Sequence, residues 1–504
     1  LRPLLPIGDA TFRVDSAGFG PVEQKDVRLQ GDEHRELDFS LTPASVTSTV
    51  EVSATEVAVQ TNNPSLGQVI TSQQVADLPL NGRNFVQLAT LTPGTVQETN
   101  PNSFFNGGPS SEVSTRGSYS LSVGGSRAQS TDWLLDGNDN NELTGGGISI
   151  LPSIDAIQEF KVLTYTYSAE YGTRAGPTVL VTTKSGSNQI HGSVFEFFRN
   201  TSLDARSYFA SEREKFNLNQ FGFALGGPIK KDKTFFFADY QARRQRKGVA
   251  FNGFVPTAAM RTGDFSSDRY GVPLPGGTQV LFNPYSIVGP GGRDPFKCDG
   301  TGNPLPVAPD GTQGVGTPCN KLPAGLINPI TQQIMLSPRF YPLPTPGIAP
   351  GSGFNFSNVP VRKLDEGEFD VRLDHTFSST DTIFARFSYD QATNFVPGGS
   401  DGFAAPSAFA SSQDITNHGR NVALSETHIF SDRTINQISG GYNRIFNHIL
   451  SFGDHSCEAA KLGIPGANLD SSCSGFPGGA PAGLSHSPTD VVRCGLTTTS
   501  GVGP

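Results

Sequence analysis

The sequence lacks the features that mark helical, nucleic-acid-binding and metal-dependent proteins. Only 16% of its 504 residues are charged, and 37 basic against 46 acidic residues leave a net charge of −9. This balance disfavours a nucleic-acid partner. No stretch approaches 18 consecutive apolar residues, so no transmembrane helix is predicted. The sequence has no C-x-x-C, H-E-x-x-H or phosphate-loop pattern. We therefore expect that the protein is not an enzyme and that it binds no metal and no cofactor.

Glycine, proline and aromatic residues are abundant instead. The chain has 58 glycines, 37 prolines, 36 phenylalanines and 11 tyrosines. Glycine and proline interrupt helices, and aromatic side chains favour strands, so a mainly β protein with long loops is predicted. The many aromatic residues also argue against intrinsic disorder.

Strict alternation of apolar and polar residues marks the second half of the chain. The clearest segments are 368–377 and 382–390, in which Phe384 is the one exception. Their polar faces contain five charged residues that we assign to a wet interior, either as a satisfied polar lining or as groups that bind another part of the chain inside it or guide a ligand: Asp370, Arg372, Asp374, Arg386 and Asp390. Further strands are expected at 190–199, 219–226, 236–243, 420–430 and 434–445.

The connections between these segments alternate between short and long. Tight turns are expected at 230–233, 378–381 and 431–433, whereas 200–215, 248–364, 396–417 and the stretch after 449 are long. An outer-membrane barrel has short periplasmic turns and long external loops. We therefore expect a transmembrane antiparallel β-barrel wall of about seven strands, incomplete because it is a fragment.

The five cysteines lie late in the chain. Cys298 with Cys319, and Cys457 with Cys473, can each close a short loop in an oxidising compartment, and unpaired thiols are the alternative. Cys494 is left over. In the first half, short helices are expected at 72–78, capped by Ser72, and at 85–91. Residues 45–61 are expected to be extended with no partner strand nearby, either as a linker or as a strand that pairs with a distant partner.

Ordered motifs along most of the chain resemble TonB-dependent outer-membrane receptors of the Oar-like group, which have a carboxypeptidase-regulatory-like domain at the N-terminus. The resembling motifs are Leu78-Pro79-Leu80-Asn81-Gly82-Arg83, Leu91-Thr92-Pro93-Gly94, Arg116-Gly117, Leu135-Asp136-Gly137, Glu170-Tyr171-Gly172 and Gly226-Gly227-Pro228-Ile229. The resemblance implies four parts: the end of a partial β-sandwich at 1–42, a linker at 43–65, an α+β plug at 66–186, and a truncated barrel at 187–504.

The resemblance implies energised import across the outer membrane, without cofactor. TonB and its inner-membrane energising complex would pull on a short periplasmic segment, the TonB box, that adds as a strand to TonB. The matching residues are Thr49, Val50, Glu51, Val52, Ser53 and Ala54, and an ordinary linker is the alternative. The other implied partners are outer-membrane lipid and a small-molecule, saccharide or peptide ligand, with the long loops extracellular.

Two groups of plug residues were weighed against other roles. Arg83 and Arg116 are expected to be structural or to contact the wall, rather than to bind substrate. The run 136–142 invites a calcium-loop interpretation, but Asn141 replaces the glycine and Gly147 the glutamate that such a loop needs. A plug loop is expected there.

Two other functions fit parts of the same sequence. One is a non-transporting adhesin or structural surface protein with the receptor architecture. The other is a soluble all-β binding protein, which leaves the alternation of loop lengths unexplained. The long loop 248–364, rich in aromatic residues, is the expected external capture surface of a receptor.

Overall fold

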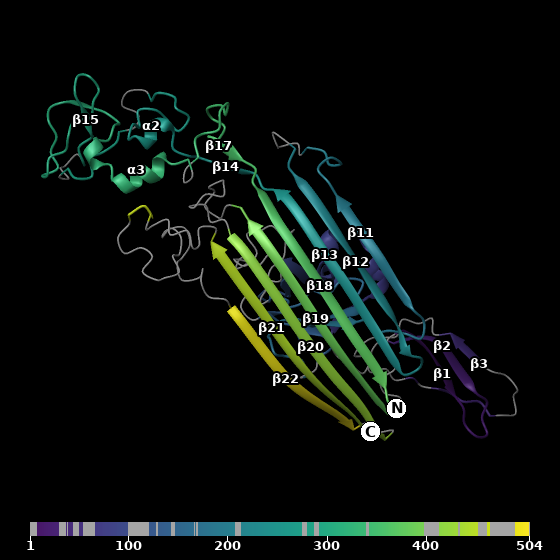
Figure 1. Ribbon diagram of the computed structural model, residues 1–504. Coiled ribbons are helices and arrows are strands. Elements are labelled where there is room, and N and C mark those ends of the chain that lie inside the picture. Colours follow the sequence, from purple (N-terminus) through teal and green to yellow (C-terminus); the bar gives the residue numbers. More distant parts are fainter. Residues whose placement is uncertain are drawn as a thin grey trace.

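The computed structural model in Figure 1 describes most of the chain. The described residues are 8–29, 37, 39–43, 50–53, 66–98, 120–127, 130–142, 147–165, 167, 170–206, 213–274, 280–286, 292–338, 342–397, 413–431, 434–451, 461–463 and 489–502. Their main sheets have three, five and eight strands, and three pairs of short strands accompany them.

The three-stranded sheet lies near the N-terminus. β1 (Gly8–Val14) pairs antiparallel with β2 (Val22–Leu29), and β3 (Val50–Ser53) pairs with β2 in parallel. Of the two alternatives for residues 45–61, the structure has Val50–Ser53 as a strand with a partner that is distant in sequence. The partner comes from a strand more than 20 residues earlier, and the local pattern of β3 contains no information about it.

The five-stranded sheet is the centre of the described part of residues 66–186, called the plug below. Its order is β4-β9-β10-β7-β8. The strands are β4 (Leu66–Thr71), β9 (Ile157–Tyr165), β10 (Thr178–Thr183), β7 (Asp132–Leu135) and β8 (Asn138–Asp139). Trp133, Phe160 and Val179 are buried in its core, which fixes these strands in one compact unit.

Short helices cover this core. α1 (Ser72–Asp77) is capped by Thr71 instead of the predicted Ser72, because Thr71 and Gln74 form a reciprocal capping box. η1 (Asn81–Arg83) and η2 (Phe85–Leu91) are 3₁₀ helices. The ring of Phe85 meets that of Phe160 edge to face at 5.3 Å, so η2 packs directly on β9. β5 (Thr95–Glu98) and β6 (Ser120–Val123) form a separate pair.

The eight-stranded sheet, called the wall below, is an antiparallel meander. Its strands are β11 (His191–Arg199), β12 (Phe216–Lys230), β13 (Thr234–Gly248), β18 (Val361–Thr376), β19 (Asp381–Val396), β20 (Gln413–Ser431), β21 (Thr434–Ser451) and β22 (Thr489–Val502). The prediction of about seven strands missed β22, whose threonine, serine and glycine content hides any alternation. Backbone pairing with β21 forms this strand.

The wall exposes its apolar side chains and buries its charged ones. Val371 and Leu373 are 39% and 45% exposed, whereas Asp370 and Arg386 are 3% and 2% exposed. This is the reverse of a soluble sheet, and it suits a face in lipid and a face in a polar lumen. Phe384, the exception in the pattern, lies under the Arg372 guanidinium at 4.4 Å.

Short turns and the longest described connection lie at opposite ends of the wall. Residues 231–233 and 377–380 make tight turns at the end where Figure 1 shows β1–β3. At the other end, 249–360 form an elaborate loop. The loop contains β14 (Phe251–Gly253), α2 (Ala258–Arg261), β15 (Lys297–Cys298), β16 (Thr317–Pro318), η5 (Ala324–Leu326), α3 (Pro329–Leu336) and β17 (Phe356–Asn358). Within the described ranges, every helix is too short or too polar to traverse a bilayer.

A disulfide joins two strands inside this loop. Cys298 of β15 and Cys319, next to β16, are bonded, with their Cα atoms 5.7 Å apart. The second suggested pair, Cys457 with Cys473, lies outside the described residues.

Candidate functional site

The plug lies against the buried, polar face of the wall, which makes the interface between them the candidate site. Figure 1 draws the plug strands behind the wall, and hydrogen bonds link the two over sequence separations of more than 200 residues. The contacts come from several places on the plug, which include residues 136–141, the segment 147–150, Thr183 of β10, and η1.

Asp136 is the centre of the interface. It sits in the turn between β7 and β8 with φ of +48°, a left-handed conformation that Asp and Asn tolerate better than most residues. Its carboxylate accepts a 2.7 Å bond from Arg386 Nε and a 3.2 Å bond from Arg372 Nη1. Thr183 of β10 donates to it from both its backbone N–H, at 2.9 Å, and its hydroxyl, at 2.8 Å. One plug carboxylate therefore bridges two strands of the wall.

The two arginines are held in place by the wall. Arg372 donates to Asp374 at 2.9 Å, and Arg386 donates to Asn421 at 2.8 Å. Arg386 also donates to Ser388, which in turn donates to Asp370. These bonds within the wall orient both guanidiniums toward the plug carboxylate.

Burial and charge act in opposite directions on Asp136. Burial alone would raise its pKa, but the guanidiniums of Arg372 and Arg386 and the hydrogen bonds from Thr183 outweigh it and hold the pKa below its usual range. The group is therefore ionised at neutral pH, as an ion-paired contact requires.

Asparagines of the wall bind the plug backbone next to this ion pair. Asn421 donates to the Asp139 carbonyl at 3.0 Å, and Asn443 donates to the Asn141 carbonyl at 3.1 Å. The Ser149 hydroxyl donates back to Asn443 at 2.7 Å. These bonds satisfy plug backbone groups that would otherwise be buried without partners.

Arg83 makes the third contact. Its guanidinium pairs with Asp155 of the plug and donates to Gln241 of β13 at 3.2 Å. It also lies 4.1 Å from the centre of the Phe195 ring on β11. Arg83 is thus a structural and wall-contacting residue in this structure.

Two glycines of the wall give the plug room. A Cβ on Gly441 would lie 2.5 Å from Asn138 Oδ1, and one on Gly419 would lie 2.7 Å from Ile150 Cδ1. Both distances are far below contact distance, so the absence of a side chain lets the plug approach the wall at these positions.

Replacing Gly441 with valine is expected to push the plug off the wall. Overpacking of this kind costs about 1–3 kcal/mol. Denaturant unfolding of the chain in detergent micelles measures the loss. Gly367→Val is the matched control, because a Cβ there meets nothing nearer than the Tyr240 hydroxyl at 3.8 Å. Equal stability of the two variants would contradict the close plug approach.

The other predicted site residues fall into four groups. Asp136, Arg372, Asp374 and Arg386 meet at the ion-pair centre, with Gly137 beside it in the turn. Asp370 and Asp390 are buried on the same face of the wall. Arg116, Gly117, Thr49 and Ala54 lie outside the described residues, and Val50–Ser53 form β3.

The sequence analysis missed Thr183, Asn421 and Asn443. The signal for the two asparagines was present, since extending the alternation of 420–430 and 434–445 places both on the polar face. Nothing local distinguishes Thr183 from the other threonines of its segment. Two residues of the rejected calcium loop have other partners: Asp136 accepts from arginines of the wall, and Asn141 Nδ2 donates to Asp132 within the plug at 2.7 Å.

Known proteins of related sequence or structure include outer-membrane proteins. Residues 182–497 match the family described as outer membrane beta barrel domain. The TonB-dependent transporter Oar of Myxococcus xanthus is 26% identical over 254 residues, which cover 47% of this chain and 22% of that protein. The chain thus spans about a fifth of this curated relative.

Solved structures align over about three quarters of the chain. The outer membrane transporter YddB from Escherichia coli aligns with a TM-score of 0.42 and 9% identity, covering 76% of this chain and 39% of its own. The siderophore receptor PirA from Acinetobacter baumannii aligns with a TM-score of 0.42 and 15% identity, covering 76% and 40%.

Proposed function

The chain belongs to the outer membrane beta barrel domain family, which locates it in the outer membrane, and from this premise we propose that it acts in TonB-dependent uptake. In this proposal the plug closes the lumen beside the wall, a ligand binds from outside, and TonB pulls from the periplasm to open a path. The role is transport, not catalysis.

The polar plug–wall interface is the observation that supports this proposal most directly. A plug that must move needs contacts that can be exchanged for contacts with water. Hydrogen bonds and ion pairs meet this need, because water replaces them and their net contribution is modest, about 0.5–1.5 kcal/mol for a typical bond. Asn421, Asn443 and Arg372 make contacts of this kind. An apolar interface would instead expose hydrophobic surface to water whenever the plug moved.

We propose that residues 49–54 are the segment on which TonB pulls. Val50–Ser53 are already a strand, and they sit at the edge of a small sheet with β2 as their partner. Strand addition to TonB would therefore require β3 to exchange the edge of β2 for the edge of TonB. Only four residue pairs join β3 to β2, so few backbone hydrogen bonds must break for this exchange.

A proline in the segment is expected to weaken TonB binding. Val52→Pro removes a backbone N–H that strand addition uses. Binding of the whole chain, in detergent micelles, to the C-terminal domain of TonB is measured by calorimetry. We expect at least roughly tenfold weaker binding for Val52→Pro, and unchanged binding for the control Thr61→Pro.

The same measurement separates transport from the rival function. A surface adhesin of identical architecture has no use for TonB, so undetectable binding of the unmodified chain would favour that role. Equal binding of Val52→Pro and the unmodified chain would place the TonB contact elsewhere.

For the ligand, we propose capture on the loop 249–360. Phe282 and Tyr285 are 52% and 61% exposed there, unlike the buried aromatics of the plug core. Phe254 is flanked by Tyr270 at 5.9 Å and by the Arg269 guanidinium at 4.3 Å. Exposed aromatic side chains suit stacking on a ring-containing ligand.

A further inference from the structure

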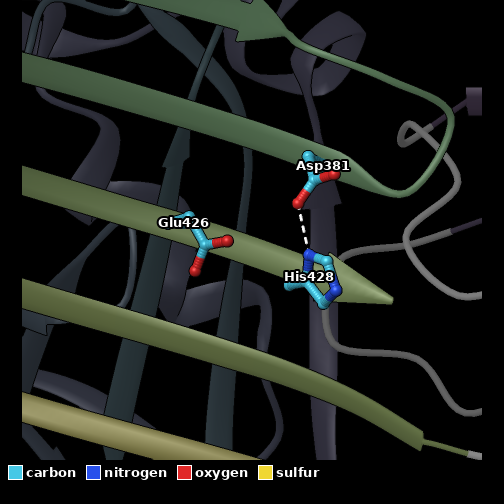
Figure 2. A group of neighbouring side chains, drawn as sticks. All are labelled: Asp381, Glu426 and His428. Carbon is cyan, nitrogen blue, oxygen red and sulfur yellow. Dashed lines mark hydrogen bonds and ion pairs between the residues drawn. The ribbon is translucent and has the colours of Figure 1, made fainter. Parts of the chain in front are cut away.

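Three potential metal ligands meet at the short-turn end of the wall, away from the plug. Figure 2 shows Asp381 at the start of β19, with Glu426 and His428 on the neighbouring β20. Asp381 and His428 are direct cross-strand partners. Glu426 is two residues before His428, and the strand period of two therefore places both on one face.

This group faces away from the plug. Ser425 and Thr427, the alternate residues of β20, are buried at 3% and 7% exposure, whereas Leu424 and Phe430 on the face of the group are 49% and 66% exposed. The group thus belongs to the lipid-side face, at the end of the wall where the tight turns lie. It shares no residue with the plug interface.

The donor atoms are close enough to share one ion. One ligand atom from each residue lies within 4.8 Å of the others. His428 Nδ1 already contacts Asp381 Oδ1. The second oxygen of Asp381 accepts from Ser378 at 2.8 Å and from Thr380 at 3.1 Å, which orients the carboxylate.

Glu426 takes no part in the Asp381–His428 ion pair. Asp381 and His428 satisfy each other, but within the described part of the chain the Glu426 carboxylate has no hydrogen bond and no ion pair. A second carboxylate beside Asp381 repels it unless a positive charge lies between them. A divalent cation supplies that charge and uses all three groups.

We propose that Asp381, Glu426 and His428 bind a divalent cation of the zinc class. One imidazole nitrogen and two carboxylate oxygens are ligands that Zn²⁺ accepts, and three protein ligands leave a fourth position for water. The side chains of Asp381 and His428 are 30% and 33% exposed, so an ion can reach them. Bound there, the ion ties the end of β20 to the turn that begins β19.

Zinc binding to the whole chain tests the proposal. The chain, purified in detergent micelles without a polyhistidine tag, competes for Zn²⁺ with a chromophoric chelator. We expect one ion per chain, and a loss of roughly 100-fold in affinity for His428→Ala, because even changes beside a metal ligand cost 10–100-fold. His375→Ala is the matched control, since His375 lies on the same face of β18 and is bonded to Thr234.

Glu426→Gln separates a metal site from a simple ion pair. An Asp381–His428 pair does not need Glu426, so unchanged zinc affinity in this variant would overturn the proposal, as would equal binding by His428→Ala and the unmodified chain. Thermal unfolding without zinc checks that the variants fold. Added Zn²⁺ is expected to raise the midpoint of the unmodified chain and His375→Ala only, because binding to the folded state stabilises it.

Discussion

Asp136→Asn is expected to lower the free energy of unfolding by about 3 kcal/mol, because it leaves two buried guanidiniums without their shared carboxylate. The side chain of Asp136 is 2% exposed and that of Arg386 is fully buried, so water cannot replace the lost charge. The effect is at the low end for a broken buried pair, since Asp374 still pairs with Arg372. Denaturant unfolding in detergent micelles measures it.

Replacement with asparagine removes the charge without adding backbone strain, so it measures the effect of the charge alone. Asp136 has a positive φ, which asparagine tolerates and alanine does not, so Asp136→Ala would add strain to the loss of charge. Asp15→Asn is the control. It breaks the Arg13–Asp15 pair, whose side chains are both 62% exposed, and it should leave stability unchanged. Equal effects of the two changes would mean that the ion pair does not hold the plug.

The same variant predicts a pH dependence with a definite sign. Because the pKa of Asp136 is depressed in the folded chain, its stabilisation is fully present above about pH 4 and is lost as the pH falls through the depressed value. The stability difference between the unmodified chain and Asp136→Asn should therefore stay constant between pH 7 and about pH 4 and shrink only as the pH is lowered further. Other carboxylates titrate in both proteins and cancel in this difference.

Replacing both Cys298 and Cys319 with serine is expected to destabilise the loop 249–360 by roughly 3 kcal/mol. The disulfide spans 21 positions, and removing it restores the freedom of that segment in the unfolded loop. Hydrogen exchange of the loop amides, compared with and without the double change, measures the loss. Exchange in β9 of the plug should be unaffected.

Lys321→Met is the matched change within the same loop. Lys321 pairs with Asp264 at 3.7 Å, and both side chains are 36% exposed, so this contact is worth less than about 1 kcal/mol. If the double serine variant exchanged no faster than Lys321→Met, the disulfide would have no part in holding the loop.

Much of the wall was predictable because its period is local. In residues 368–377 and 382–390 apolar and polar side chains alternate, with Phe384 as the one exception. The sequence of each strand is therefore enough to predict which of its faces is polar. Phe384 broke the pattern, and only the neighbouring strand explains it, since Arg372 lies over its ring. β22 escaped prediction for the converse reason: pairing with β21 makes it a strand, although its own residues do not alternate.

The sequence alone determined the mainly β architecture, the separation of short turns from long loops, and the set of charged residues on the polar face of the wall, because each depends on neighbours within a few positions. Only the tertiary structure decided which plug group those charges meet, where β3 finds its partner, and that Glu426 stands beside Asp381. These depend on backbones brought together from distant parts of the chain, and no local pattern of residues encodes such distances.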